Sequence, residues 1–224
     1  MKRSIITTSD GSKTIQIEDW DEQYHSIHGA IQESQHVFIK TGLHHFLKLY
    51  QPDHLSILEI GFGTGLNAFL TALEAQTHKL KIQYDGVEAY PVLEEELLQL
   101  NYAPLIAADQ HHLFEALHHV SWEELQPLTS SFSLKKRQQF FMDIEDENTF
   151  DLIYFDAFGA RVQPELWTEA IFKRMFKALK NKGVLVTYAA KGSVRRAMQA
   201  VGFTVERLEG PPGKREMLRA SKSI

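Results

Sequence analysis

The spacing of hydrophobic and polar positions changes near residue 56. Before that point, two short β-rich runs, Ser4–Thr8 and Lys13–Ile17, flank Asp10-Gly11, a dipeptide typical of hairpin turns. A polar helical stretch follows to about Tyr50. Beyond residue 56, short apolar runs alternate with amphipathic segments. That alternation predicts parallel strands joined by crossover helices.

The apolar runs predict a seven-stranded, mostly parallel sheet. The expected strands are Ser56–Ile60, Ile82–Glu88, Gln139–Phe141, Phe150–Asp156, Gly183–Ala189, Phe203–Leu208 and Glu216–Ala220. Only the turn Gly210–Gly213 separates the last two, so we expect them to pair antiparallel. Five parallel strands that end in an antiparallel hairpin are typical of the class I methyltransferase fold, a Rossmann-like α/β architecture. We therefore expect a core domain over residues 51–224, with residues 1–50 as an N-terminal extension that packs on it.

Three of the crossover helices carry clear marks. Leu66, Phe69, Leu70 and Leu73 share one helical face, and a second helix has the same spacing from Val194 to Val201. Pro164 is suited to the first turn of a third helix. We expect that helix to run to Lys182, with Gly183 placed to end it.

Composition narrows the class of protein. A chain of 224 residues with 43% hydrophobic residues can bury one substantial core, and the absence of cysteine excludes disulfide scaffolds, zinc ribbons and thiol nucleophiles. The start of the chain is polar and no stretch approaches the length of a membrane span. We therefore expect a soluble, cytoplasmic protein without membrane contacts.

The net charge of −5 is the sum of two opposed regions. Residues 1–172 carry 26 acidic and 11 basic residues, a net −15, whereas residues 173–224 carry 3 and 13, a net +10. A basic quarter of this kind indicates either an anionic partner or a solvated helical surface with a basic tail.

A glycine-rich loop follows the first predicted parallel strand. Gly61, Gly63 and Gly65 stand between that strand and an amphipathic helix, the setting of a nucleotide-binding loop. A dinucleotide fingerprint needs its third glycine one position later, where Leu66 stands. Glu59 would repel a pyrophosphate but suits an ammonium group. S-adenosylmethionine has such an ammonium and no phosphate, and it is the cofactor that we expect.

Two further acids complete the expected cofactor site. Glu88 ends the second strand, where a carboxylate accepts hydrogen bonds from both ribose hydroxyls. Asp143 is suited to accept from an adenine amino group, although it lies in an acidic run and could equally be a surface carboxylate.

Asp156 stands at the carboxyl end of the buried run Phe150–Phe155, the edge of a parallel sheet at which ligands bind. A carboxylate there can orient an amine nucleophile and accept its proton, so we predict a catalytic role for Asp156. The alternative is a helix cap or a loop anchor.

Histidine pairs such as His44-His45 and His118-His119 do not predict a metal site. Neighbouring residues on a helix point about 100° apart and do not share a ligand, unlike residues at i and i+4. We therefore expect no metal.

At this point the chain resembles a known family. The segments Leu58–Thr71, Val87-Glu88, Phe150–Trp167, Gly192–Arg196 and Gly213–Leu218 are similar to the methyltransferase half of the bifunctional tRNA wobble-uridine enzyme MnmC. The motifs Asp156-Ala157-Phe158 and Arg215-Glu216-Met217 are far more specific than the glycine loop. The chain stops at Ile224, so the flavin-dependent oxidase half is expected to be absent, as in the stand-alone form MnmD. Gly159-Ala160 departs from the proline that the family often has after Asp-Ala-Phe.

The resemblance implies S-adenosylmethionine-dependent methylation of 5-aminomethyl-2-thiouridine in tRNA, giving 5-methylaminomethyl-2-thiouridine, without oxidase activity. It places Glu33 and His36 near the substrate pocket, and Phe158 or Tyr188 against the extruded uracil ring, although Tyr188 could equally be a core residue. The expected phosphate contacts are Lys191, Arg195, Arg196, Lys214 and Arg215.

Three other functions are compatible with parts of the sequence. A methyltransferase acting on a small-molecule amine would have similar site chemistry, but it would not need the basic C-terminal quarter. An NAD-dependent oxidoreductase is disfavoured by the glycine spacing and the terminal hairpin. A non-catalytic tRNA-binding protein is disfavoured by Asp156.

Overall fold

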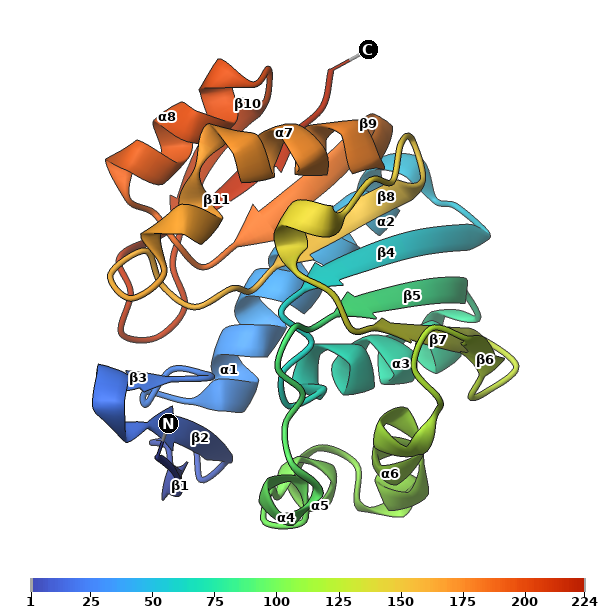
Figure 1. Ribbon diagram of the computed structural model, residues 1–224. Coiled ribbons are helices and arrows are strands. Elements are labelled where there is room, and N and C mark those ends of the chain that lie inside the picture. The colour runs from blue at the N-terminus through green and yellow to red at the C-terminus, as the bar shows by residue number, and fades with distance from the viewer. Residues whose placement is uncertain (1, 224) are drawn as a thin grey trace.

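A computed structural model describes residues 2–223, and its centre is one eight-stranded sheet (Figure 1). The spatial order is β10-β11-β9-β8-β4-β5-β7-β6. Five strands run parallel: β4 (His54–Ile60), β5 (Lys81–Val87), β7 (Phe132–Arg137), β8 (Phe150–Phe155) and β9 (Leu179–Thr187). Three are antiparallel to a neighbour: β6 (Leu125–Pro127), β10 (Thr204–Glu209) and β11 (Glu216–Ser221). The predicted antiparallel hairpin is confirmed, and β6 adds an eighth strand that the sequence pattern did not predict.

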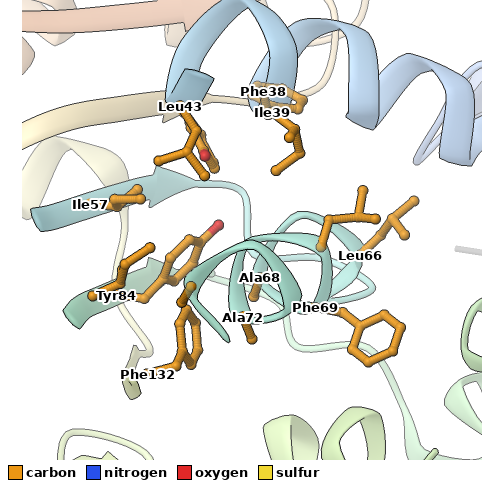
Figure 2. Close-up of a cluster of buried hydrophobic side chains, with 14 of the residues drawn as sticks. Phe38, Ile39, Leu43, Ile57, Leu66, Ala68, Phe69, Ala72, Tyr84 and Phe132 are labelled. Atoms are coloured by element: carbon orange, nitrogen blue, oxygen red, sulfur yellow. The ribbon is translucent and has the colours of Figure 1, made fainter. Parts of the chain in front are cut away.

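Alternate residues of the strands face two separate hydrophobic clusters, because successive side chains of a strand point to opposite sides. Ile57 of β4 and Tyr84 of β5 face the first cluster, which Figure 2 shows between the sheet and α3 (Leu66–His78). Leu58 and Ile60 face the second, under α7 (Glu169–Ala178) and α8 (Gly192–Ala200). Helices therefore cover both faces and leave the carboxyl edge of the sheet for a ligand.

The N-terminal part forms a small sheet and a helical segment. The predicted hairpin is confirmed as β1 (Arg3–Thr7) and β2 (Lys13–Ile17), and the short strand β3 (Glu22–Gln23) pairs with the other side of β2. After the 3-10 turn η1 (Glu18–Trp20), the chain continues as α1 (Ala30–Ser34), the π-helix η2 (Gln35–His44) and α2 (His45–Tyr50). Phe38, Ile39 and Leu43 of η2 belong to the first cluster, beside Ile57 (Figure 2).

Short elements occupy the connections around the core. Those between β5 and β7 are α4 (Glu94–Leu97), α5 (Tyr102–Ile106), η3 (Ala108–Gln110), α6 (His111–His119) and β6. Two 3-10 turns, η4 (Phe141–Asp143) and η5 (Pro164–Trp167), flank β8. Among residues 2–223, no helix is long and apolar enough to cross a membrane.

Two predicted elements are wrong. The third parallel strand is Phe132–Arg137 and not Gln139–Phe141, which lies in the following loop and in η4. That strand looked polar because it contains Lys136, yet Lys136 is buried and its ammonium donates to the carbonyl of His118 at 2.5 Å. A lysine with a backbone acceptor can occupy a core-facing position, which a hydrophobic pattern does not reveal.

The helix from Pro164 does not reach Lys182. It is divided into η5 and α7, and α7 ends at Ala178. The backbone amides of Asn148 and Thr149 donate to the carbonyls of Lys177 and Ala178 at 2.8 and 2.9 Å, so the last turn is satisfied by a segment distant in sequence. Gly183 lies inside β9 and does not end a helix.

Candidate active site

A cavity of about 520 Å³ opens at the carboxyl edge of the sheet. Its lining comes from the carboxyl ends of β4, β5 and β8 and from the N-terminal extension. In Figure 1 these carboxyl ends are the tips of the strand arrows. The volume is within the range of small-molecule and cofactor sites. Of the residues predicted for the cofactor and the amine, Gly61, Gly63, Glu88, Asp143 and Asp156 line it.

The glycine loop is held close to Asp156 by backbone hydrogen bonds. The amides of Gly61 and Phe62 both donate to the carbonyl of Val87 at 3.0 Å, and the amide of Asp156 donates to the carbonyl of Ile60 at 2.9 Å. Gly61 has φ +90°, and a Cβ atom there would lie 2.6 Å from the backbone oxygen of Asp156. Only glycine fits this position, so the loop passes directly beside the backbone of Asp156.

Glu88 lies just beyond the end of β5 and faces the cavity. Its two carboxylate oxygens accept from the amides of Gly63 and Tyr90, at 3.1 and 3.0 Å. Burial raises the pKa of Glu88, while these two hydrogen bonds lower it. The carboxylate is therefore fixed against the glycine loop with lone pairs left for hydroxyl donors.

Asn67, in the first turn of α3, joins the two acids of the site. Its Nδ2 donates to Glu59 Oε1 at 2.8 Å and to Asp156 Oδ2 at 2.9 Å. Glu59 is fully buried and is not among the residues that line the cavity, so it supports Asn67 from behind. Asn67 was not among the residues predicted from the sequence. The feature that could have indicated it is a polar residue on the otherwise apolar face that begins at Leu66.

The residues present fit the expected cofactor. Within residues 2–223, Glu59 Oε2 and Asn67 Oδ1 are buried acceptors without a hydrogen-bond partner, and such atoms call for a donor group. Glu88 lines the cavity and supplies acceptors for hydroxyl groups. An amino acid ammonium and a ribose, both present in S-adenosylmethionine, match this donor and acceptor set. Gly61, Gly63, Glu88 and Asp143 remain our candidates to hold it. The prediction of direct contact is not supported for Glu59 and Gly65, because neither lines the cavity: Glu59 is buried behind Asn67, and Gly65 lies against the ring of His118.

Exposed aromatic rings form the outer rim of the same cavity. Tyr90 and Phe140 are 59% and 57% exposed, and their rings meet edge to face at 6.1 Å. Asp143 lies next to them in η4, is exposed, and lines the cavity. Two exposed aromatic rings beside an acceptor suit a flat, amino-bearing ring such as adenine.

The N-terminal extension covers the glycine loop. His25 Nε2 and Thr64 Oγ1 share a buried hydrogen bond of 2.8 Å, and burial lowers the pKa of His25 to about 4. Tyr24 lies against Gly63 and meets the ring of Phe158 edge to face at 4.9 Å. On the outer side, Arg161 donates to the carbonyls of Trp20 and Asp21, at 2.9 and 2.7 Å. These contacts join the loop after Asp156 to the extension, and residue patterns gave no sign of them.

Asp156 has the properties of a general base. Its pKa is raised to about 7, chiefly by burial and also by the charge of Glu33, while the hydrogen bond from Asn67 and the charge of Lys214 act in the opposite direction. A carboxyl group with a pKa near neutrality can both accept and release a proton at physiological pH. The raised pKa also explains why the protein tolerates a buried acid in this cavity: at neutral pH, a fraction of the protein molecules carries Asp156 in its uncharged form.

We expect the rate of methyl transfer, measured as kcat/KM, to rise as the pH increases through about 7. Below that pH, Asp156 is protonated and cannot accept a proton from the acceptor amine. Rates measured from pH 5.5 to 9 at saturating cofactor would test this expectation. A flat profile across pH 6–8 would contradict the assigned role.

The predicted substrate residues divide into two groups. Glu33, Phe158, Tyr188 and Lys214 line the cavity, together with Asp156. His36 does not line it: its Nε2 donates to the carbonyl of Glu209, 2.8 Å away, and so ties η2 to the end of β10. The remaining basic residues lie outside the cavity lining, at the start of α8 and beside the β10–β11 turn: Lys191, Arg195, Arg196 and Arg215.

Within residues 2–223, one group of side chains has the spacing of metal ligands. His44 Nε2 and His78 Nε2 lie 2.6 and 3.2 Å from Glu74 Oε2. None of the three lines the cavity. His44 reaches Glu74 and His78 of α3 and not its neighbour His45, and Glu74 and His78 stand at i and i+4, a pair that the argument from adjacent histidines did not consider.

Comparison with known proteins supports this interpretation. Residues 132–223 match the family described as S-adenosyl-L-methionine-dependent methyltransferase. The tRNA 5-methylaminomethyl-2-thiouridine biosynthesis bifunctional protein MnmC of Actinobacillus pleuropneumoniae is 29% identical over 92% of this chain and 33% of that protein. MnmC of Aromatoleum aromaticum is 30% identical over 88% of this chain and 32% of that protein. The chain thus spans about a third of the length of these curated relatives.

The crystal structure of MNMC2 from Aquifex aeolicus has the same fold. It matches with a TM-score of 0.82 at 27% identity and covers 100% of this chain and 72% of that chain. Family match, relatives and fold together identify the chain as an S-adenosylmethionine-dependent methyltransferase that resembles the methyltransferase domain of MnmC.

Proposed function

We propose that the chain methylates the amine of 5-aminomethyl-2-thiouridine at the wobble position of tRNA, giving 5-methylaminomethyl-2-thiouridine. The names of the MnmC relatives support this reaction, because they specify biosynthesis of its product, 5-methylaminomethyl-2-thiouridine, in tRNA. The basic C-terminal quarter supports a nucleic acid partner. A tRNA substrate also implies the cytoplasmic location that we expect from the sequence.

One observation carries the chemical part of the proposal: Asp156 lies in the cofactor cavity with its backbone against Gly61, and Glu33 lines the same cavity. Two carboxylates in one enclosed site favour a cationic group such as an ammonium over a neutral hydroxyl or ring carbon. An alkylamine has a pKa near that of lysine, so about 0.1% of it is neutral at pH 7. A base with a pKa near neutrality therefore has a direct task here.

The mechanism needs little more than alignment and removal of one proton. When bound, S-adenosylmethionine supplies an activated methyl group on its sulfonium. Asp156 orients the substrate amine and accepts its proton, which frees the lone pair to form the new N–C bond as the C–S bond breaks. Asn67 holds Asp156 Oδ2 in place during this step. Gly61, Gly63 and Glu88 would hold the cofactor, which would be converted to S-adenosylhomocysteine.

Aromatic side chains are placed to receive the base. Phe158 follows Asp156 by two residues and meets Trp20 and Tyr24 edge to face, at 5.9 and 4.9 Å. A rigid ring beside the catalytic carboxylate suits a flipped-out uracil, because every base presents a flat face for stacking.

We expect the exposed basic residues to bind tRNA phosphates. Arg196→Glu and Arg215→Glu should each raise the KM for tRNA about 10-fold and leave kcat within about twofold, because phosphate contacts position the substrate without entering the chemistry. The slope of log KM against the logarithm of the salt concentration should also decrease by roughly 1 for each substitution, because each removes one phosphate contact. Steady-state kinetics at three salt concentrations would measure both effects.

Lys81→Glu is the matched control. Lys81 is an exposed lysine at the amino end of β5, the end of the strand opposite the cavity. An equal rise in KM for Lys81→Glu would show that total charge matters and that a defined tRNA surface does not.

Methyl incorporation tests the proposed function itself. The protein is incubated with methyl-labelled cofactor and with tRNA that bears the unmodified aminomethyl group, and in parallel with small primary amines. We expect label in the tRNA fraction and none in the free amines. Label in the small amines alone would overturn the tRNA assignment in favour of a small-molecule methyltransferase.

A further inference from the structure

Lys214 lies inside the cavity and not among the exposed basic residues near it. It lies in the β10–β11 turn, yet its ammonium forms an ion pair with Glu33 of α1. The same ammonium lies over the ring of Tyr188, 3.8 Å from the ring centroid. These two contacts commit the charge of Lys214 to the site and leave little of it for a tRNA phosphate.

The partners of Lys214 are themselves held in place. The second oxygen of Glu33 accepts from the amide of Ser26 at 2.8 Å, and the hydroxyl of Tyr188 donates to the carbonyl of Ala157, also at 2.8 Å. Ala157 is the residue after Asp156. Lys214 therefore contacts Glu33, which contributes a negative charge to the site, and Tyr188, which is hydrogen-bonded to the residue after Asp156.

The turn that carries Lys214 is also fixed to the extension. Gly213 has φ +82°, and a Cβ atom at this position would overlap the ring of His28. Lys214 itself donates from its amide to the carbonyl of Pro211 at 2.9 Å. A movement of the terminal hairpin, for example on tRNA binding, would thus be transmitted to the lysine.

We propose that Lys214 is a positioning residue for the transfer reaction, which holds Glu33 and Tyr188 beside Asp156 and couples the β10–β11 turn to the amine site. This inference rests on the proposed function for the identity of the amine. It assigns to Lys214 a different role from the phosphate contact that the basic cluster suggested.

The electrostatic surroundings of Asp156 make the role measurable. Five ionisable groups interact electrostatically with it: Glu33 (α1), Glu59 (β4), Tyr84 (β5), Tyr188 (after β9) and Lys214 (between β10 and β11). Lys214 is the cation of this set and lowers the pKa of Asp156, whereas Glu33 raises it. Loss of the lysine charge leaves Glu33 without its partner and should make Asp156 a weaker acid.

The test follows the Asp156 carboxyl directly, by carbon-13 NMR of aspartate-labelled full-length protein, with Asp156→Asn to assign the signal. We expect Lys214→Ala to move the titration midpoint of Asp156 clearly upward and Lys214→Arg to leave it close to the wild-type value. In single-turnover assays at saturating tRNA and pH 7, Lys214→Ala should be slower by about 10- to 100-fold, with a smaller deficit at pH 9.

Arg215→Ala is the neighbouring control, and it should raise the KM for tRNA without moving the titration. If Lys214→Ala behaved in the same way, with only KM changed, Lys214 would be a phosphate contact and the proposal would be wrong. Lys214→Met keeps the aliphatic stem and replaces Lys214→Ala if the latter does not fold. A wild-type protein that labels no tRNA would refute the proposed function, but the Asp156 titration would still decide the role of Lys214.

Discussion

Asp156→Asn is expected to slow single-turnover methyl transfer to tRNA about 10³-fold, within the range found when a positioned general base is removed. Asparagine has nearly the same shape and can still accept the hydrogen bond from Asn67 through its side-chain oxygen, so the geometry should be kept. It cannot accept a proton from the acceptor amine. The affinity for S-adenosylhomocysteine, measured by calorimetry, should change by no more than about threefold. An unchanged transfer rate would show that Asp156 is only a loop anchor.

Stability provides the control for that substitution. In the folded protein the pKa of Asp156 is raised from 3.8 to about 7, so ionisation of Asp156 destabilises the fold as the pH rises from about 4 to 7. Asparagine has no such dependence. The variant should therefore be more stable than the wild type by about 4 kcal/mol at pH 8, with little difference at pH 4. Thermal unfolding at both pH values would measure this, and a loss of stability at pH 8 would mean that the carboxylate has a structural role.

Gly61→Ala should remove cofactor binding and destabilise the protein by about 3 kcal/mol or more. A left-handed backbone costs an L-residue about 1–2 kcal/mol, and a crowded site adds a similar amount. The crowding is specific, since the new methyl group would lie 2.6 Å from the backbone oxygen of Asp156. We expect the affinity for S-adenosylhomocysteine to fall at least about 100-fold, which corresponds to about 2.7 kcal/mol.

Gly11→Ala separates the cost of a left-handed backbone from the cost of crowding. Gly11 has φ +84°, close to the +90° of Gly61, but nothing lies within 4 Å of its Cβ position. It should therefore lose only the backbone part, about 1 kcal/mol, and keep full cofactor affinity. Equal losses in the two variants would mean that backbone strain alone is responsible and that the close approach to Asp156 is unimportant.

The sequence predicts the fold well wherever burial produces a regular pattern. The strands ending at Ile60 and Phe155 are mainly apolar runs, and the terminal hairpin follows from a turn too short for a crossover helix. The prediction was wrong where a polar residue is buried with a partner from elsewhere. Lys136 disguised β7 in this way, and α7 ends because amides of a distant loop satisfy its last carbonyls.

The candidate site shows the same division. Glycines and acids at strand ends are visible in one dimension because parallel strands bring their carboxyl ends together, and Gly61, Glu88 and Asp156 do line one cavity. Asn67, His25 and Arg161 could not be recognised, because each acts through a partner far away in the sequence. Basic character alone also could not separate Lys214, which is paired inside the cavity, from Arg215 beside it, which is exposed.

The most direct test of the account is the identity of the methylated nucleoside. Transfer RNA that bears 5-aminomethyl-2-thiouridine is treated with the protein and methyl-labelled cofactor, digested to nucleosides and analysed by mass spectrometry with fragmentation. We predict one labelled product, 5-methylaminomethyl-2-thiouridine from the wobble position, with the methyl group on the side-chain nitrogen. Label on a ribose, on a ring atom or on a nucleoside from another position would contradict it.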